Sequence, residues 1–159
     1  MVSRLLVALL YAAISFTAQA ASHKINGKVV SVADGDTLTI LDNNHEQHRV
    51  RLAEIDAPEK AQNFGQVSKQ SLADLTFGKM ADATCSDTDR YGRSVCKVVV
   101  DGINVNTEQV ARGYAWVYAQ YASKFSVLHG YQLKAKADRK GLWSDPKPVP
   151  PWEWRRESK

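Results

Sequence analysis

The chain has 159 residues, of which 44% are hydrophobic and 24% charged, and it carries a formal net charge of +4. This length suits one compact domain, and the composition excludes a disordered chain, a collagen-like chain and a protein with many membrane spans. Two cysteines are too few for a multi-disulfide scaffold or a four-cysteine zinc site. The small surplus of basic residues favours a polyanionic partner without identifying one.

The first 20 residues have the pattern of a secretory signal peptide, which predicts a mature chain that begins at Ala21 and is secreted or periplasmic. Arg4 precedes an apolar run over residues 5–16, and Ala18-Gln19-Ala20 is a small-x-small cleavage signal. The run is shorter than the roughly 20 residues that span a bilayer. No stable membrane association is therefore expected after cleavage. An uncleaved membrane anchor is the alternative.

Three extended segments and a helix follow. Residues 25–32 are rich in β-branched side chains, whereas residues 37–40 and 47–52 alternate polar and apolar. The sheet ends before Pro58, because the residue that precedes a proline is pushed away from the helical region. Residues 64–77 carry an apolar stripe at helical spacing and end before a glycine, which predicts a helix.

Two further strands are predicted over residues 80–85 and 94–100, joined as a hairpin. Cys85 and Cys96 then lie opposite each other across the hairpin, and their pairing is expected in an oxidising compartment. Two buried free thiols are the alternative. A disulfide that closes so short a loop stabilises a protein by about 2–3 kcal/mol.

The last third of the chain is predicted to be helical and then rich in proline. Asn106 and Gln109 resemble a capping pair that opens a short helix ending at Gly113. A longer helix is predicted over residues 123–139. Residues 145–151 hold four prolines, which predicts that this segment is not helical.

The predicted element order is β-β-β-α-β-β-α-α. It fits a mainly β (α+β) fold, a five-stranded OB-fold Greek-key barrel with three packed helices. We therefore expect one domain over residues 21–144 and a Pro/Trp-rich tail over residues 145–159. Two tryptophans beside prolines in this tail suit either docking on the barrel or binding a partner.

Three short segments carry side chains suited to phosphodiester hydrolysis, although each alone is typical of an ordinary turn or loop. They are Asp-Gly-Asp-Thr at 34–37, Arg-Leu-Ala-Glu-Ile-Asp-Ala-Pro-Glu at 51–59 and Asp-Arg-Tyr-Gly-Arg at 89–93. The reaction needs a placed nucleophile and neutralised phosphate charge. Asp36 and Asp56 offer hard oxygen ligands for Ca²⁺. Arg51 and Arg93 offer permanent cations that match phosphate geometry. Glu59 is placed to reach a metal-bound water.

These segments resemble the motifs of the thermonuclease family, the staphylococcal nuclease-like phosphodiesterases. The matching motifs are V-A-D-G-D-T at 32–37, R-L-A-E-I-D-A-P-E at 51–59, D-R-Y-G-R at 89–93 and G-L-W-S at 141–144. The similarity runs from about Lys24 to Trp143, nearly the whole mature domain. The resemblance implies an OB barrel with three helices and Ca²⁺-dependent cleavage of DNA and RNA that leaves a 3′-phosphate and a 5′-hydroxyl.

The resemblance also implies a role for each matching residue. Asp36 and Asp56 match the carboxylate ligands of Ca²⁺, and Ala57 matches a position that adds its backbone carbonyl. Glu59 matches the residue that orients or deprotonates the attacking water. Arg51 matches the arginine that holds the phosphate.

The remaining matches concern the leaving group and the substrate. Arg93 resembles the arginine nearer the leaving 5′-oxygen. Asp34 lies beside the metal in this pattern and acts through water. The implied substrate-contacting positions are Asp34, Arg90, Tyr91 and either Tyr121 or Tyr118.

Two other functions also fit the sequence. One is an OB module that binds single strands without cutting them, and the other is an envelope-interaction protein that works through its Trp-rich tail. Three converging carboxylates argue against a pure binder, because they repel a phosphate when no metal is present. The four histidines show no metal-site spacing beyond a lone H-x-x-H. We therefore expect a monomeric nuclease with DNA and RNA as partners.

Overall fold

The computed structural model describes residues 22–124 and 126–158. The signal peptide predicted over residues 1–20 lies outside the described residues. Within the described residues, no helix is both long enough and apolar enough to cross a membrane.

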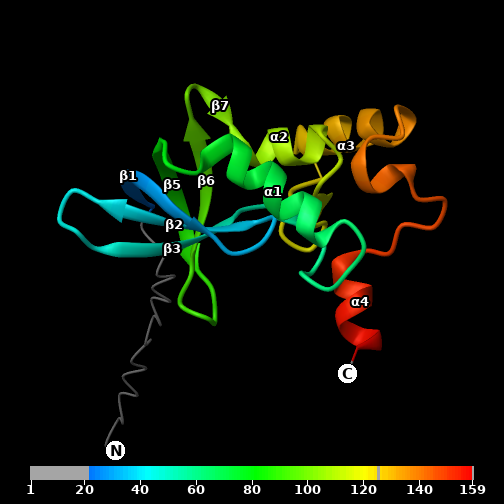
Figure 1. The fold of residues 1–159 in the computed structure, drawn as a ribbon, viewed down its shortest axis with the longest axis horizontal. Coiled ribbons are helices and arrows are strands. Elements are labelled where there is room, and N and C mark those ends of the chain that lie inside the picture. The colour runs from blue at the N-terminus through cyan, green and yellow to red at the C-terminus, as the bar shows by residue number, and fades with distance from the viewer. Residues whose placement is uncertain (1–21, 125, 159) are drawn as a thin grey trace, which may run out of the picture.

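Five strands of the main sheet close into a barrel (Figure 1). The strand order is β3-β2-β1-β5-β6-β7, and a parallel pairing between β3 and β6 closes the ring. The strands of this sheet are β1 (His23–Val32), β2 (Thr37–Asp42), β3 (Gln47–Leu52), β5 (Met80–Thr88), β6 (Ser94–Val100) and β7 (Ile103–Asn104). Two short strands, β4 (Ile55–Asp56) and β8 (Trp116–Val117), form a separate pair beside the barrel. The predicted five-stranded barrel is confirmed.

Alternating apolar side chains of the strands fill the barrel and fix its register. Leu38 and Ile40 of β2 and Val50 of β3 are fully buried. Burial of each such side chain stabilises the fold by about 1.5–3 kcal/mol. A slip of one residue would turn all of them toward solvent. The pairing of Thr37 with Arg51 is therefore a fixed feature of the β2–β3 hairpin.

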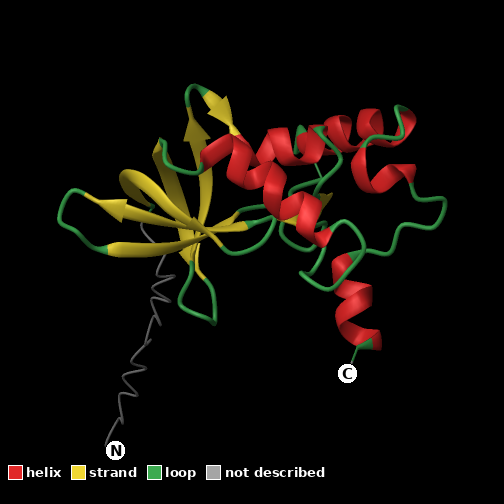
Figure 2. Ribbon diagram, viewed as in Figure 1, coloured by secondary structure: helices red, strands yellow, loops and turns green. Residues whose placement is uncertain are grey.

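The helices gather on one side of the barrel (Figure 2). They are α1 (Gly65–Thr76), α2 (Val105–Ala111), α3 (Leu128–Ala137), the 3₁₀ turn η1 (Gly141–Ser144) and α4 (Pro151–Glu157). The first helix matches its prediction closely. The third is shorter than predicted, because a turn closed by the Ser126 N–H and the Ser123 carbonyl precedes it.

The fourth helix was not predicted, and the prediction that residues 145–151 contain no helix is wrong at the last position. Pro151 is the first residue of α4. Proline is tolerated there because the N–H groups of the first turn have no acceptor within the helix, and the φ of proline already suits a helix.

The capping role predicted for Asn106 is also wrong. The side chain of Asn104 caps α2, two residues earlier than expected. Asn106 is instead buried, and its Oδ1 accepts a hydrogen bond from the Val98 N–H at 3.0 Å. Its Nδ2 donates to the carbonyls of Ala53 and Cys96 at 3.0 and 3.1 Å. This amide therefore ties α2 to β6 and to the loop after β3.

A disulfide joins Cys85 and Cys96 across the β5–β6 hairpin, as predicted. Both cysteines are fully buried. Cys96 also faces Leu52 in the parallel β3–β6 pairing. The bond therefore lies at the seam where the barrel closes.

We expect reduction of this disulfide to lower the free energy of unfolding by about 2–3 kcal/mol, because the unfolded chain regains loop freedom. Thermal unfolding with and without a reductant measures the effect. A Cys85→Ala/Cys96→Ala protein serves as the control, because its melting temperature should not respond to reductant. An unchanged melt of the wild type after confirmed loss of the bond would contradict the expectation.

Candidate active site at the barrel rim

The turn between β1 and β2 places a buried carboxylate at the rim of the barrel. Asp36 is 6% exposed, and its Oδ2 accepts a hydrogen bond from the Ala57 N–H at 3.0 Å. Its Oδ1 accepts from the Thr37 hydroxyl at 2.9 Å. Asp34 holds the turn from the other side, since its Oδ1 accepts from the Asp36 N–H at 3.1 Å. Burial, together with the nearby charge of Asp36, raises the pKa of Asp34 to about 6.

A buried amide of α2 supports this turn from below. Gln109 is fully buried, and its Nε2 donates to the carbonyl oxygens of Gly35 and Ser68 at 2.8 and 3.2 Å. Its Oε1 accepts from the Ser71 hydroxyl at 2.7 Å. Gly35 has no space for a β-carbon, because Ser68 and Ala57 lie against it. The position of Asp36 is thus fixed by α1 and α2 together.

A second buried carboxylate comes from β4. Asp56 is 2% exposed, and burial raises its pKa despite the neighbouring guanidinium groups. The Arg51 Nη2 lies 3.3 Å from the Asp56 Oδ1 and 3.7 Å from the Asp36 Oδ2. One guanidinium group therefore contacts both carboxylates. The β2–β3 register makes this possible by placing Arg51 beside the start of β2.

Glu59 and a residue from the tail complete this cluster. Arg155 of α4 places its Nη2 2.7 Å from the Asp56 Oδ2 and its Nη1 2.7 Å from the Glu59 Oε1. These hydrogen bonds, the one with Asp56 first, raise the pKa of Arg155 and keep it charged. The three carboxylates thus surround two guanidinium groups. Arg155 was not predicted as a site residue, and only the pair of arginines after the tail tryptophans marked it in the sequence.

The β5–β6 hairpin brings Arg93 to the same rim. The Arg93 Nη1 donates to the Thr37 hydroxyl at 3.1 Å, next to Asp36. Its Nε donates to the Asp89 Oδ2 at 2.7 Å, which orients the side chain. The Tyr91 ring is exposed and lies against the guanidinium groups of Arg90 and Arg93, at 4.9 and 5.5 Å from its centroid.

The other predicted aromatic contact lies beside this cluster rather than in it. The Tyr121 and Tyr118 rings meet edge to face at 4.9 Å, and the backbone N–H of Tyr118 donates to the Glu54 carbonyl. Tyr121 is 64% exposed. Trp152 of the tail stacks on Tyr118 at 5.2 Å and so covers that ring. Of the two tyrosines, Tyr121 presents more free aromatic surface.

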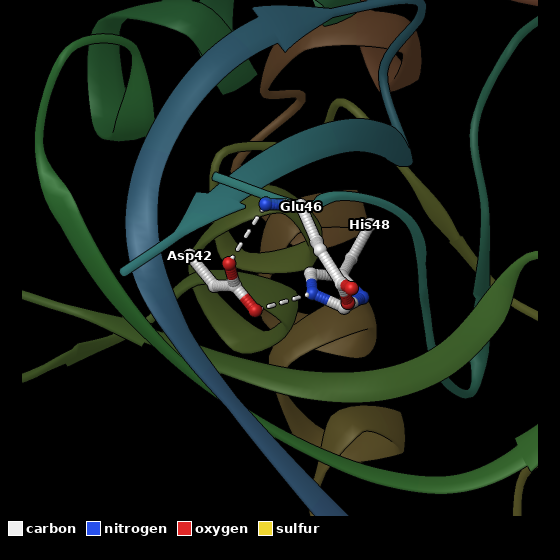
Figure 3. Close-up of side chains that lie close together, drawn as sticks. All are labelled: Asp42, Glu46 and His48. Carbon is white, nitrogen blue, oxygen red and sulfur yellow. Dashed lines mark hydrogen bonds and ion pairs between the residues drawn. The ribbon is translucent and has the colours of Figure 1, made fainter. Parts of the chain in front are cut away.

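A second group of possible metal ligands lies at the opposite end of β2 (Figure 3). Asp42, Glu46 and His48 place ligand atoms within 4.8 Å of one another. The Asp42 Oδ1 accepts from the N–H groups of Asn44 and Glu46, and its Oδ2 contacts the His48 Nε2 at 2.9 Å. The His48 hydrogen bond lowers the pKa of Asp42. Both oxygens of Asp42 therefore already clamp the β2–β3 turn. The sequence had predicted no ligand role for His48.

Comparison with known proteins assigns the family. The family described as staphylococcal nuclease homologue matches residues 49–145. The chain belongs to this family. It is 46% identical over 132 residues to a protein of Escherichia coli described as an uncharacterized endonuclease, covering 82% of this chain and 85% of that protein. It is 42% identical over 143 residues to a micrococcal nuclease of Shigella flexneri, covering 84% and 82%. The predicted membership of the thermonuclease family is confirmed, and the matched residues include Arg51, Glu59 and Arg93.

The Asp89–Arg93 contact gives a pH-dependent prediction. Burial opposes ionisation of Asp89, but hydrogen bonds from the backbone and side chain of Arg93 outweigh it and lower the pKa. The charged form therefore stabilises the native state above the ordinary aspartate pKa of about 3.9, and this contribution is lost as the pH falls through the lower native pKa.

We expect Asp89→Asn to lower the free energy of unfolding by about 1 kcal/mol at pH 7, through loss of a charge-assisted hydrogen bond. The difference from wild type should shrink as the pH falls below about 4. Urea unfolding at both pH values measures it. Asp87→Asn, near the end of β5, is the control, because Asp87 is exposed and its Oδ1 accepts a hydrogen bond from the adjacent backbone N–H of Thr88. A difference that grows in acid would contradict the prediction.

Proposed function

We propose that this chain is an exported Ca²⁺-dependent endonuclease that hydrolyses phosphodiester bonds of DNA and RNA with little sequence specificity. The observation that carries the proposal is the pair of buried carboxylates, Asp36 and Asp56, held against the single guanidinium group of Arg51. Membership of a nuclease family supports the class of hydrolase and a nucleic-acid substrate. Export rests on the signal peptide expected from the first 20 residues.

The chemistry of the donor set fits a hard divalent cation. Asp36 and Asp56 would supply carboxylate oxygens, and Ala57 would supply its carbonyl. Two ionised carboxylates are costly to bury without a compensating positive charge. Arg51 supplies one such charge, and in this structure Arg155 of the tail supplies the other. The chemistry that such an ion supplies when bound is neutralisation of phosphate charge and activation of water.

The arginines and Glu59 would perform the remaining tasks. Arg51 lies 3.7 Å from the Asp36 carboxylate and Arg93 hydrogen-bonds to the adjacent Thr37, and together their planar guanidinium groups would hold the phosphate and stabilise its developing charge. Glu59 would orient the attacking water or take its proton. Arg93, nearer the leaving 5′-oxygen, would stabilise the charge that develops there. The products would carry a 3′-phosphate and a 5′-hydroxyl.

Exposed aromatic rings suit a substrate with unpaired bases. Tyr91 is 65% exposed and Tyr121 is 64% exposed. A stacked base stabilises binding by about 1–3 kcal/mol regardless of its identity, which fits low sequence specificity. Arg90, beside Tyr91, would contact a neighbouring phosphate, and Asp34 would reach the metal through water.

We expect the chain over residues 21–159 to cut single- and double-stranded DNA with Ca²⁺ and to stop when a chelator is added. Glu59→Gln should lower the cleavage rate at least 100-fold, in the range of a lost general base. Gel assays of cleavage, with Glu108→Gln on the surface of α2 as a matched control, measure both effects.

Two outcomes would contradict the proposal. One is equal cleavage by the Glu59→Gln protein and the wild type. The other is salt-sensitive binding of DNA without any cutting, which is the result expected of an OB binding module. If Glu46→Gln abolished Ca²⁺-dependent cleavage while substitutions at the rim did not, the metal would instead be placed at the β2–β3 turn.

A further inference from the structure

The tail reaches the proposed catalytic cluster through one side chain. Arg155 is separated from Asp56 by 99 positions and from Glu59 by 96, yet it contacts both carboxylates at 2.7 Å. A third contact joins its Nη1 to the Asp56 Oδ1 at 3.3 Å. The guanidinium group is thus bidentate on Asp56 and shared with Glu59.

These contacts occupy the oxygens that a cation would need. The Asp56 Oδ2 accepts from Arg155, and the Asp56 Oδ1 accepts from both Arg155 and Arg51. A planar guanidinium fork matches a carboxylate with both of its oxygens, so little of Asp56 is left for another partner. A divalent cation ligated by Asp56 would have to displace Arg155 from it.

Charge balance leads to the same conclusion. Arg51 and a divalent cation together neutralise the three carboxylates of Asp36, Asp56 and Glu59. Arg155, in contact with Asp56 and Glu59, would then be a further positive charge close to the cation, and like charges repel each other in a partly buried site. On this count Arg155 leaves the three carboxylates with a net charge of −1, a divalent cation brings the net charge to zero, and the two together bring it to +1.

The segment that carries Arg155 is attached by a small number of contacts. Trp152 stacks on Tyr118 and meets Trp116 edge to face at 5.7 Å. The Gln62 Nε2 donates to the Val149 carbonyl at 2.6 Å. Within α4 only Pro151 is buried. A cavity of about 110 Å³ remains between the tail and the segment before α1, lined in part by Trp116 and Trp154. Elements with few buried contacts are those that move at low energetic cost.

We propose that Arg155 is a built-in competitor of the divalent cation, which occupies Asp56 and Glu59 until the metal displaces it. The inference rests on the proposed function, because it takes Asp56 as a metal ligand. It makes the tail an autoinhibitory segment that sets the Ca²⁺ concentration at which the site becomes active.

The test is calorimetric titration of Ca²⁺ into the wild type, Arg155→Gln and Arg156→Gln proteins, with circular dichroism to establish that each is folded. Arg156 is exposed and follows Arg155 on the same helix, so its substitution removes the same charge without removing the contacts to Asp56 and Glu59. We expect Arg155→Gln to lower the Kd for Ca²⁺ at least 5-fold relative to Arg156→Gln, the size of an ordinary coupling between two ligands. Arg155→Lys should lie between wild type and Arg155→Gln, because it keeps the charge and loses the fork.

Cleavage assays supply a second readout. Arg155→Gln should cut DNA faster than wild type at limiting Ca²⁺ and at the same rate at saturating Ca²⁺. Equal Kd values in Arg155→Gln and Arg156→Gln would overturn the inference alone. Weaker binding in Arg155→Gln would also overturn it, and would make Arg155 a residue that holds the carboxylates in place for the metal. Absence of Ca²⁺ binding in every protein would overturn the proposed metal together with this inference.

Discussion

Two like charges buried side by side are the constraint on which the rim of this barrel depends. Asp36 and Asp56 are almost fully removed from water, and each would be costly there as an isolated ion. Arg51 contacts both, and it does so because the β2–β3 register sets it opposite Thr37. The hydrophobic alternation of two strands therefore fixes the electrostatics of the site, since the same register that buries Val50 brings the guanidinium group to the carboxylates.

Two buried side-chain amides hold the loops that carry Asp36 and Asp56. Asn106 and Gln109 both lie on the buried side of α2, and each satisfies three hydrogen bonds to neighbouring segments. Gln109 holds the carbonyl of Gly35, next to Asp36, and Asn106 holds that of Ala53, close before Asp56. The loops that carry these two carboxylates need such support, because a displacement of about 1 Å in a catalytic group lowers the reaction rate strongly. The helix thus acts as a brace for both carboxylates.

The sequence predicted the barrel, the disulfide and the family because their signals are local or repeated. Strand alternation and turn residues lie within a few positions of each other, and the family motifs combine short segments in a fixed order. Asn106 was misassigned because an amide at a helix start is typical of a cap, while its burial depends on β6 and on the loop after β3. The contact of Arg155 with Asp56 spans 99 positions, and no local pattern encodes it. The helix that carries Arg155 was not predicted because it begins in a proline-rich stretch. Proline breaks the interior of a helix, but it is favoured at the first helical position, where Pro151 lies.

The two ends of β2 show how protein contacts decide what a carboxylate is free to do. One oxygen of Asp42 accepts hydrogen bonds from two backbone N–H groups and the other contacts His48, so both oxygens stabilise the β2–β3 turn. Asp36 also accepts hydrogen bonds, from Thr37 and Ala57, yet it shares Arg51 with a second buried carboxylate. Charge at the rim is thus balanced only when a cation beyond Arg51 is present. The tail supplies one from its own helix, which joins the C-terminal segment energetically to the centre proposed to perform the chemistry.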